Sequence, residues 1–345
     1  MATRRALLVC LTATLLLGAC SSGASPSSPA GTPDANPSQS QAAELTPITF
    51  HYDWVPTSGD VPMLAAEKFG YFADAGISVT TTPGGPQINC AQLVASGEQD
   101  ICISPAVGII PAEPTGVPYI AVGLIQQKAP YGLIVGPDRG ISGPKDLEGH
   151  KIGTQPDNTY YALWKAFEKA QGIDESTIEE VAIGFGPEPL FSGQVDAVPD
   201  FISLVPAQVT AHYGEEAVTF LFADYDAWAA GQAIIVNDQF AADHPDAVRG
   251  FVEAYGKGMA WALENEADAI DLVVESYPDL GRDIVAVELP ALLKFWTSPD
   301  TDEHGLLYSG DEVWQRTYDM MREYGFLNED YEVTEVYTND FLPNA

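Results

Sequence analysis

Positive charge is scarce in this sequence. Fifteen lysines and arginines stand against 49 aspartates and glutamates, which gives a formal net charge of −34. A negative field of this size argues against binding to nucleic acid or to an anionic membrane surface, and it disfavours a small anionic ligand. We interpret most of the charge as a solvated acidic surface that keeps the protein soluble.

Catalytic and metal-binding motifs are also lacking. The five histidines are scattered, with no H-x-x-H or H-E-x-x-H spacing, so no metal site is expected. Neither a G-x-S-x-G elbow nor a G-x-x-x-x-G-K-[ST] loop occurs. Single acids such as Asp157 or Asp200 are more often surface or capping residues than catalysts. We therefore expect no enzyme active site, no metal and no cofactor.

Long apolar runs are missing apart from a short one at the N-terminus. Arg4 and Arg5 precede the apolar run Ala6–Leu17, which is too short to span a bilayer in the usual way. The run continues into Leu17-Gly18-Ala19-Cys20, which resembles a bacterial lipobox. We expect residues 1–20 to be a lipoprotein signal peptide, with Cys20 lipidated, and residues 21–45, rich in Ser, Gly, Pro and Ala, to be a flexible linker.

Cysteine is scarce as well. Removal of Cys10 with the signal peptide and lipidation of Cys20 would leave Cys90 and Cys102. We expect Cys90 in the first turn of a helix and Cys102 in the strand that follows. An oxidising compartment permits a disulfide between them, but two small buried hydrophobic side chains are the alternative, and the sequence leaves both open.

The stretch 51–79 predicts a strand, an open loop, a helix and a second strand. The first strand ends at Asp53-Trp54, and Asp60 and Pro62 introduce the helix. The loop 54–59 therefore lies where a strand ends and a helix begins. Ligands of open α/β sheets bind at such places, and the large aromatic Trp54 stands there.

Strands and helices alternate along the rest of the chain, in the rhythm of a mostly parallel sheet covered on both faces. A second α/β block begins near Lys151, and helices dominate after Asp238. This order predicts two α/β lobes joined by two crossing strands, with Ala233–Asn237 resembling a mate of Tyr131–Val135. We place lobe 1 at residues 46–134 and 236–345 and lobe 2 at residues 135–235, with a small ligand between them.

Further side chains suited to ligand binding fall at strand ends or helix starts. Aromatic rings can stack on a flat ring, while amides and carboxylates can bind its edge, so the set suits a neutral or weakly basic heteroaromatic solute. The predicted ligand-binding residues are Trp54, Asp60, Gln87, Asn89, Ser104, Gln126, Asn158, Thr159, Tyr160, Phe185, Asp200, Phe201 and Tyr225.

Several of these residues have simpler interpretations. Phe185 and Phe201 could equally belong to the core, Tyr225 could pack a loop, and Ser104 could only cap the helix that Pro105 opens. Trp54 is the residue on which the prediction depends most.

Motifs along the whole chain after the linker resemble those of the NMT1/THI5-like (SsuA/THI5-like) solute-binding proteins of ABC importers. The segments that carry this resemblance are D-W-x-P at 53–56, A-x-E-K-F-G-Y-F-A-D-A-G-I-S-V at 65–79, P-G-G at 83–85, Q-L-V-A-S-G at 92–97, P-K-D-L-E-G-H-K-I-G at 144–153, L-F-S-G-Q-V-D-A-V at 190–198 and the C-terminal Y-T-N-D-F-L-P.

The resemblance implies a type II periplasmic-binding-protein fold and delivery of a captured solute to an ABC permease and its ATPase. It is strongest to the branch that binds pyrimidine precursors of thiamine. We therefore expect a monomeric protein, lipid-anchored on the outer face of the cell membrane, that binds such a pyrimidine or a similar flat heterocycle and is not an enzyme.

The sequence departs from that branch at two places. A histidine commonly sits six residues after the tryptophan, and Asp60 replaces it here; residues 200–203 replace a Tyr-Trp-Asn-like segment. One alternative is an alkanesulfonate, taurine or nitrate binder, which would need cationic or amide anchors. The alternative from another class is a thiamine pyrimidine synthase, whose cysteine-rich motif and histidine this chain lacks.

Overall fold

The computed structural model describes residues 45–86, 88–137 and 139–343. The expected signal peptide, the expected lipidation site Cys20, the predicted linker up to residue 44 and the predicted ligand-binding residue Gln87 lie outside the described residues. None of the helices within the described ranges combines the length and the apolar content that crossing a bilayer requires.

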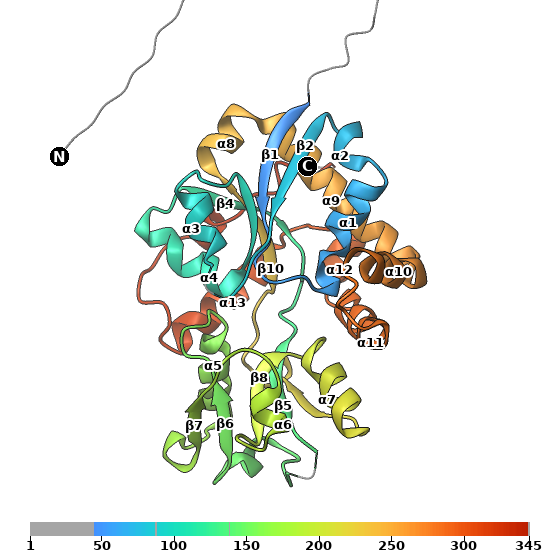
Figure 1. The fold of residues 1–345 in the computed structure, drawn as a ribbon. Coiled ribbons are helices and arrows are strands. Elements are labelled where there is room, and N and C mark those ends of the chain that lie inside the picture. The colour runs from blue at the N-terminus through green and yellow to red at the C-terminus, as the bar shows by residue number, and fades with distance from the viewer. Residues whose placement is uncertain (1–44, 87, 138, 344–345) are drawn as a thin grey trace, which may run out of the picture. The chain divides into compact units, whose positions relative to one another are not determined.

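Within these ranges the chain builds two five-stranded sheets, each flanked by helices (Figure 1). The first sheet has the order β2-β1-β3-β10-β4 and the second the order β7-β6-β8-β5-β9. The strands of the first sheet are β1 (Thr46–His51), β2 (Ile77–Thr82), β3 (Ile101–Pro105), β4 (Tyr119–Leu124) and β10 (Gln232–Asn237). Those of the second are β5 (Tyr131–Val135), β6 (Lys151–Thr154), β7 (Glu179–Ala182), β8 (Ala197–Phe201) and β9 (Val218–Leu221).

The helices follow the predicted alternation. Those between strands are α1 (Val61–Lys68), α2 (Tyr71–Asp74), α3 (Cys90–Ala95), α4 (Ala106–Ile109), α5 (Tyr161–Gln171), α6 (Glu188–Phe191) and α7 (Val205–Tyr213). The C-terminal helices are α8 (Asp238–Asp243), α9 (Pro245–Glu264), α10 (Glu266–Ser276), α11 (Arg282–Leu293), α12 (Pro299–His304) and α13 (Asp311–Glu323). Short 3-10 turns complete the set: η1 (Ser58–Asp60), η2 (Ile110–Thr115), η3 (Pro144–Leu147), η4 (Glu175–Thr177), η5 (Phe222–Tyr225) and η6 (Val333–Glu335).

The expected pairing of the strands at 131–135 and 233–237 is wrong. Strand β5 pairs with β8 and β9 in the second sheet, whereas β10 pairs with β3 and β4 in the first. Each is the antiparallel strand of its own sheet. The two strands look alike because both are apolar and buried, and this pattern does not specify the partner of a strand.

The chain crosses between the sheets through two extended segments rather than through those strands. Residues 125–130 lead from β4 to β5, and residues 226–231 lead from η5 to β10. The segments are hydrogen-bonded to each other: the Gly231 amide donates to the Gln126 carbonyl at 2.9 Å, and the Ala129 amide donates to the Ala229 carbonyl at 2.8 Å. The architecture of two α/β lobes joined by two crossings is confirmed, while the lobe bounds at 134/135 and 235/236 stay a proposal.

One hydrophobic core is shared by both sheets. It joins Cys102 and Leu124 of the first sheet with Leu133 and Ile152 of the second, and Trp314 of α13 belongs to it. A second core lies between the first sheet and helices α1, α9, α10 and α11, and a small third core belongs to the second sheet alone. The shared core restricts relative movement of the sheets along the side that α13 covers.

The two remaining cysteines form a disulfide. Cys90 is the first residue of α3, and Cys102 lies in β3, with their Cα atoms 6.1 Å apart. The bridge fastens the start of the helix to a neighbouring buried strand, and it decides between the two alternatives that the sequence left open.

Candidate ligand-binding site between the two sheets

The two sheets meet through side chains at their strand ends. The indole of Trp54, which follows β1, contacts the ring of Phe185, which follows β7, with 4.6 Å between ring centroids and an edge-on geometry. Phe185 is 41% exposed, so it does not belong to the core. We call the region around this contact the junction, and define it by Asp53, Trp54, Gln126, Tyr160, Phe185, Asp200 and Gln232.

The loop that carries Trp54 is held at both of its ends. Gly84 packs on it so closely that a Cβ at that position would lie 2.3 Å from the carbonyl oxygen of Tyr52, so only glycine fits there. At the other end, the Asp60 carboxylate accepts from the amide of Thr57 at 3.2 Å, and the Thr57 hydroxyl accepts from the amide of Gly59 at 3.2 Å. This capping box closes η1 and fixes the start of α1.

A chain of polar groups runs along the first-sheet side of the junction. The Asp53 carboxylate accepts from the side-chain amide of Gln232. The Gln126 side-chain amide in turn donates to the Gln232 Oε1 at 3.1 Å, and the Gln126 Oε1 accepts from the Gln232 backbone amide at 3.2 Å. Burial raises the pKa of Asp53 to about 6, against the opposing hydrogen bonds from its own amide, from Trp54 and from Gln232.

Three aromatic rings make the second-sheet side. Tyr160 stacks on Tyr131 at 4.7 Å, and Phe201 stands edge-on to both rings. The Tyr131 hydroxyl donates to the Pro199 carbonyl at 3.0 Å. The Tyr160 hydroxyl is buried and has no hydrogen-bond partner among the described residues. Burial and the nearby charge of Asp53 hold the pKa of Tyr160 well above its usual value.

Asp200 ends β8 beside these rings. Its carboxylate accepts from the Phe201 amide at 2.7 Å. Burial raises the pKa of Asp200 to about 6, and the Phe201 hydrogen bond only partly opposes this. The junction therefore brings two desolvated carboxylates, two aromatic walls and a free hydroxyl to one place.

Gly108 marks another close approach of the two sheets. A Cβ on Gly108 of α4 would lie 3.0 Å from the Thr159 methyl group and 3.8 Å from the Ser104 hydroxyl. The predicted residues Ser104 and Thr159 therefore come from different sheets and meet at this glycine.

Other predicted residues serve as caps. Asn158 accepts from the Tyr160 amide at 2.8 Å, and Asn89 accepts from the Gln92 amide at 3.2 Å at the start of α3. Asp60 lies behind the Trp54 loop beside Tyr52 and Tyr277, where burial raises its pKa to about 8.

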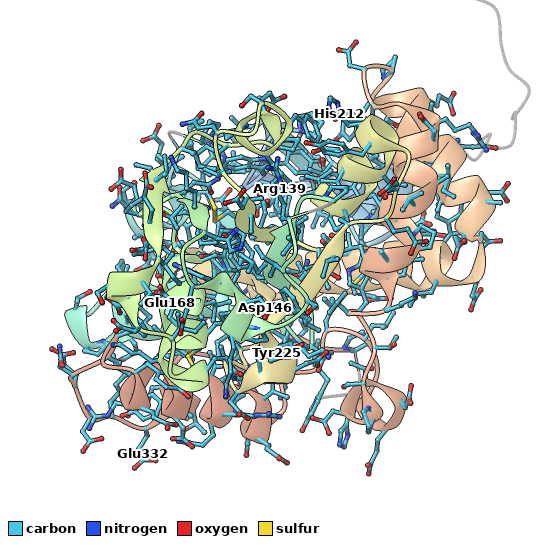
Figure 2. The ribbon with its side chains drawn as sticks, turned by 90° about the horizontal axis from the view of Figure 1, so that it is seen from below. Arg139, Asp146, Glu168, His212, Tyr225 and Glu332 are labelled. Carbon is cyan, nitrogen blue, oxygen red and sulfur yellow. A yellow bond between two sulfur atoms is a disulfide. The ribbon has the colours of Figure 1, made fainter. Side chains whose placement is uncertain are left out.

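Tyr225 packs edge-on against Phe167 and Phe220, and its side chain is labelled in Figure 2. These contacts belong to the interior of the second-sheet block. In the described part of the chain, Tyr225 makes no hydrogen bond and no aromatic contact with the residues of the junction.

The residue list from the sequence did not include Asp53, Tyr131 or Gln232. Asp53 stands next to Trp54 at a strand end, which is the signal that could have identified it. Gln232 and Tyr131 are each the first residue of the strand that follows a crossing. Their place at the junction depends on the path of the crossings, which the sequence pattern does not give.

A hollow of about 440 Å³ lies at the other end of the first sheet, beside Asp100, Asn237 and His244, and contains none of the predicted residues. Among the described residues, no three His, Cys, Asp or Glu side chains converge as metal ligands would.

Comparison with known proteins decides the family. The family model described as NMT1/THI5 like matches residues 59–269. The chain belongs to the NMT1/THI5-like family. The resemblance seen in the sequence motifs is thereby confirmed.

Proteins similar to this chain have both binding and enzymatic names. A riboflavin-binding protein from Chloroflexus aurantiacus is 27% identical, over 96% of this chain and 95% of the relative. A 4-amino-5-hydroxymethyl-2-methylpyrimidine phosphate synthase from Legionella pneumophila is 22% identical, over 86% and 93%. A formylaminopyrimidine-binding protein from Halalkalibacterium halodurans is 23% identical, over 74% and 79%.

The fold matches that of solved binding proteins. The periplasmic aliphatic sulphonate binding protein SsuA from Escherichia coli superposes with a TM-score of 0.65 at 14% identity, over 85% of this chain and 92% of that chain. At this identity the likeness shows the fold alone, and it confirms the expected periplasmic-binding-protein fold.

Proposed function

We propose that this protein is an extracytoplasmic solute-binding protein that captures a small heteroaromatic solute at the junction and delivers it to an ABC permease. The observation that supports it most is the edge-on contact between Trp54 and Phe185, because it brings together aromatic side chains that follow strands of different sheets. Parting of these rings would admit a flat molecule between them, and stacking on both faces would hold it.

The solute class follows from the residues around these rings. Carboxylates, amides and a hydroxyl border the aromatic walls, which suits the polar edge of a heterocycle. Two relatives are named for binding riboflavin and formylaminopyrimidine. Riboflavin contains a fused nitrogen heterocycle, and formylaminopyrimidine contains a single one. We favour a thiamine pyrimidine precursor or a similar flat heterocycle.

The location belongs to the same proposal. The run Leu17-Gly18-Ala19-Cys20 supports lipidation of Cys20, which would tether the protein to the outer face of the cell membrane. A tethered, monomeric binding protein can reach a permease in the same membrane through the linker at residues 21–45.

The test is a binding screen on the purified protein. Each of the following would be added separately: 4-amino-5-hydroxymethyl-2-methylpyrimidine, formylaminopyrimidine, riboflavin, taurine and nitrate. A ligand that binds only the native state stabilises it by about 2.7 kcal/mol at a concentration of 100 times its dissociation constant, so a clear rise in melting temperature is expected with a heterocycle. Stabilisation by taurine or nitrate, with none by any heterocycle, would contradict the proposal.

A variant locates the binding. Trp54→Ala should weaken binding of the stabilising heterocycle about 30-fold, because the loss of a stacking wall costs about 2 kcal/mol. The matched control is Trp261→Ala. Trp261 lies on α9 and contacts Phe69, which follows α1, so it is not part of the junction. Equal affinity of Trp54→Ala and the unchanged protein would place the solute elsewhere.

The synthase name of some relatives requires a separate measurement. Incubation of the protein alone, followed by mass spectrometry of the small-molecule fraction, should show no newly formed pyrimidine. Release of a pyrimidine phosphate from the protein would instead support the enzymatic alternative.

A further inference from the structure

The hydroxyl of Tyr160 is the least explained polar group of the junction. Tyr160 is 6% exposed, and its hydroxyl has no hydrogen-bond partner among the described residues. The ring cannot easily turn to find one, because it stacks on Tyr131 at 4.7 Å and meets Phe201 edge-on at 5.1 Å. A buried hydroxyl without a partner is costly, so a group supplied from outside the chain would stabilise it.

Two carboxylates belong to the same group of side chains: Asp53 precedes Trp54, and Asp200 accepts from the amide of Phe201, whose ring meets Tyr160 edge-on at 5.1 Å. Asp53 follows β1 of the first sheet and is close enough to Tyr160 for its charge to raise the Tyr160 pKa. Asp200 ends β8 of the second sheet, and its charge acts in the same way on the stacked Tyr131. An ionised carboxylate only accepts hydrogen bonds, and each has more acceptor sites than its described partners fill.

Cations do not neutralise these carboxylates within the described residues. The ion pairs of Lys and Arg there all go to other acids: Lys68 to Glu275, Lys128 to Asp224, Arg139 to Asp196, Lys151 to Glu179, Lys165 to Glu168, Glu175 and Glu180, Arg249 to Asp246, Lys257 to Glu253, Arg282 to Asp271 and Arg322 to Asp330. Within the described residues, neither Asp53 nor Asp200 therefore forms an ion pair with a lysine or an arginine.

We propose that Asp53, Tyr160 and Asp200 select a heterocycle that presents N–H donors, and that they reject the phosphorylated form of the same ring. This inference rests on the proposed function and adds the charge state and the edge chemistry of the solute. An amino group or a ring N–H can donate to both carboxylates and to the Tyr160 oxygen, whereas a phosphate would bring further negative charge beside desolvated carboxylates.

The first experiment compares each ring with its phosphate ester. Isothermal titration calorimetry would measure 4-amino-5-hydroxymethyl-2-methylpyrimidine against its monophosphate, and riboflavin against its 5′-phosphate, at pH 8. We expect the phosphate ester of the bound ring to bind at least about 100-fold more weakly, because repulsion between close like charges costs several kcal/mol.

The second experiment removes the acceptors one at a time. Tyr160→Phe deletes only the hydroxyl and keeps the stacked ring, so affinity should fall about threefold to tenfold. Asp200→Asn replaces an acceptor by an amide of the same shape, so affinity should fall at least about tenfold and discrimination against the phosphate ester should shrink. Melting temperatures measured without solute would show that both variants fold.

Matched controls are available nearby. Tyr161→Phe removes the adjacent hydroxyl, which donates to Glu180 at 2.8 Å on the other side of α5. Asp268→Asn removes an exposed charge on α10. Both should bind the heterocycle as the unchanged protein does.

The outcomes separate this inference from the proposed function. If Trp54→Ala weakens binding but the phosphate ester binds as tightly as the free ring, the function stands and the inference falls. The inference also falls if Tyr160→Phe and Asp200→Asn both keep full affinity and full discrimination. If no heterocycle binds at all, both are overturned.

Discussion

Two groups of carboxylates, each with at least one buried member, differ in the presence of a cation. In the second-sheet block, Lys165 of α5 makes ion pairs with Glu168, Glu175 at 3.3 Å and Glu180 at 2.9 Å. We call these four residues the paired cluster. Glu168 is labelled in Figure 2.

The paired cluster satisfies most of its charge. Burial acts to raise the pKa of Glu180, but hydrogen bonds from Lys165, Tyr161 and Trp164 outweigh it. The net result is a pKa below the usual value of a glutamate. Burial outweighs the same lysine at Glu168, whose pKa rises to about 7. Glu168 is therefore the weakest member of the cluster, and Lys165 is the group on which the others depend.

The second group lies under the Trp54 loop and contains no cation. It consists of Asp53, Asp60 and Glu288, which we call the unpaired cluster. Burial raises the pKa values to about 6, about 8 and about 7 respectively. Amides and hydroxyls of the loop oppose the effect only in part.

The presence of Lys165 makes the paired cluster a stabilising feature, whereas the unpaired cluster lowers the stability of the fold. A buried carboxylate that has a lysine holds elements together, whereas one without a cation loses its hydration and gains little in return. Asp53 alone of the unpaired cluster belongs to the junction, where the proposed solute would supply the missing partner.

Lys165→Met should have the largest effect. It leaves Glu168 and Glu180 without their cation, so we expect the free energy of unfolding at pH 8 to fall by about 3–5 kcal/mol. The loss should be smaller at pH 5, where protonation of Glu168 removes part of the uncompensated charge. Urea unfolding at the two pH values measures it.

Lys257→Met provides the control for that loss. Lys257 makes an exposed ion pair with Glu253 on α9, so its removal should cost less than about 1 kcal/mol. Equal losses in the two variants would show that the paired cluster is no more than a surface feature.

Glu288→Gln should act in the opposite direction. The raised pKa of Glu288 means that the folded state binds a proton more tightly than the unfolded chain, so its ionisation lowers stability as pH rises from about 4.5 to about 7. The neutral glutamine removes this loss. We expect the free energy of unfolding to rise by about 2 kcal/mol at pH 8 and to stay unchanged at pH 4, measured by urea unfolding.

Glu275→Gln is the control for that gain, because Glu275 is exposed and pairs with Lys68 at 3.2 Å. Its effect should be within about 0.5 kcal/mol at both pH values. A Glu288→Gln variant that is less stable than the unchanged protein at pH 8 would mean that the charged carboxylate is well accommodated.

Asp53→Asn should have the smallest effect on stability. The raised pKa of Asp53, about 6, implies that the free energy of unfolding falls as pH rises from about 4 to about 6. Because Asp53 is only part-buried, this fall is small. In the absence of solute, the free energy of unfolding at pH 8 should rise by at most about 1 kcal/mol. A fall of more than this would show that the hydrogen bond to Gln232 stabilises the fold more than the buried charge destabilises it.

Most secondary structure could be predicted from local patterns. The strand predicted at 131–135 has the expected bounds, the second α/β block continues from β6 at Lys151, and helices dominate after Asp238 as predicted. Apolar runs or a helical period of apolar residues, bounded by Gly, Pro or capping residues, predict these segments. The information is local, so neighbouring residues suffice.

Much of the junction could be anticipated for a related reason. Trp54, Tyr160, Phe185 and Asp200 stand at strand ends or helix starts, and parallel strands bring such positions to one edge of each sheet. Asp60 and Asn89 stand at similar places but cap local turns. Capping and ligand contact use the same residue types at the same positions, so the sequence pattern does not separate them.

The sequence by itself determined the class of fold, the alternation of its elements and the excess of acid over base, because each is a property of neighbouring residues or of composition. The tertiary structure alone decided that β5 and β10 belong to different sheets, that Cys90 meets Cys102, and which carboxylates are buried beside a cation. The physical reason is that pairing and loss of hydration depend on groups far apart in the chain, whose distances are set only when the whole core packs.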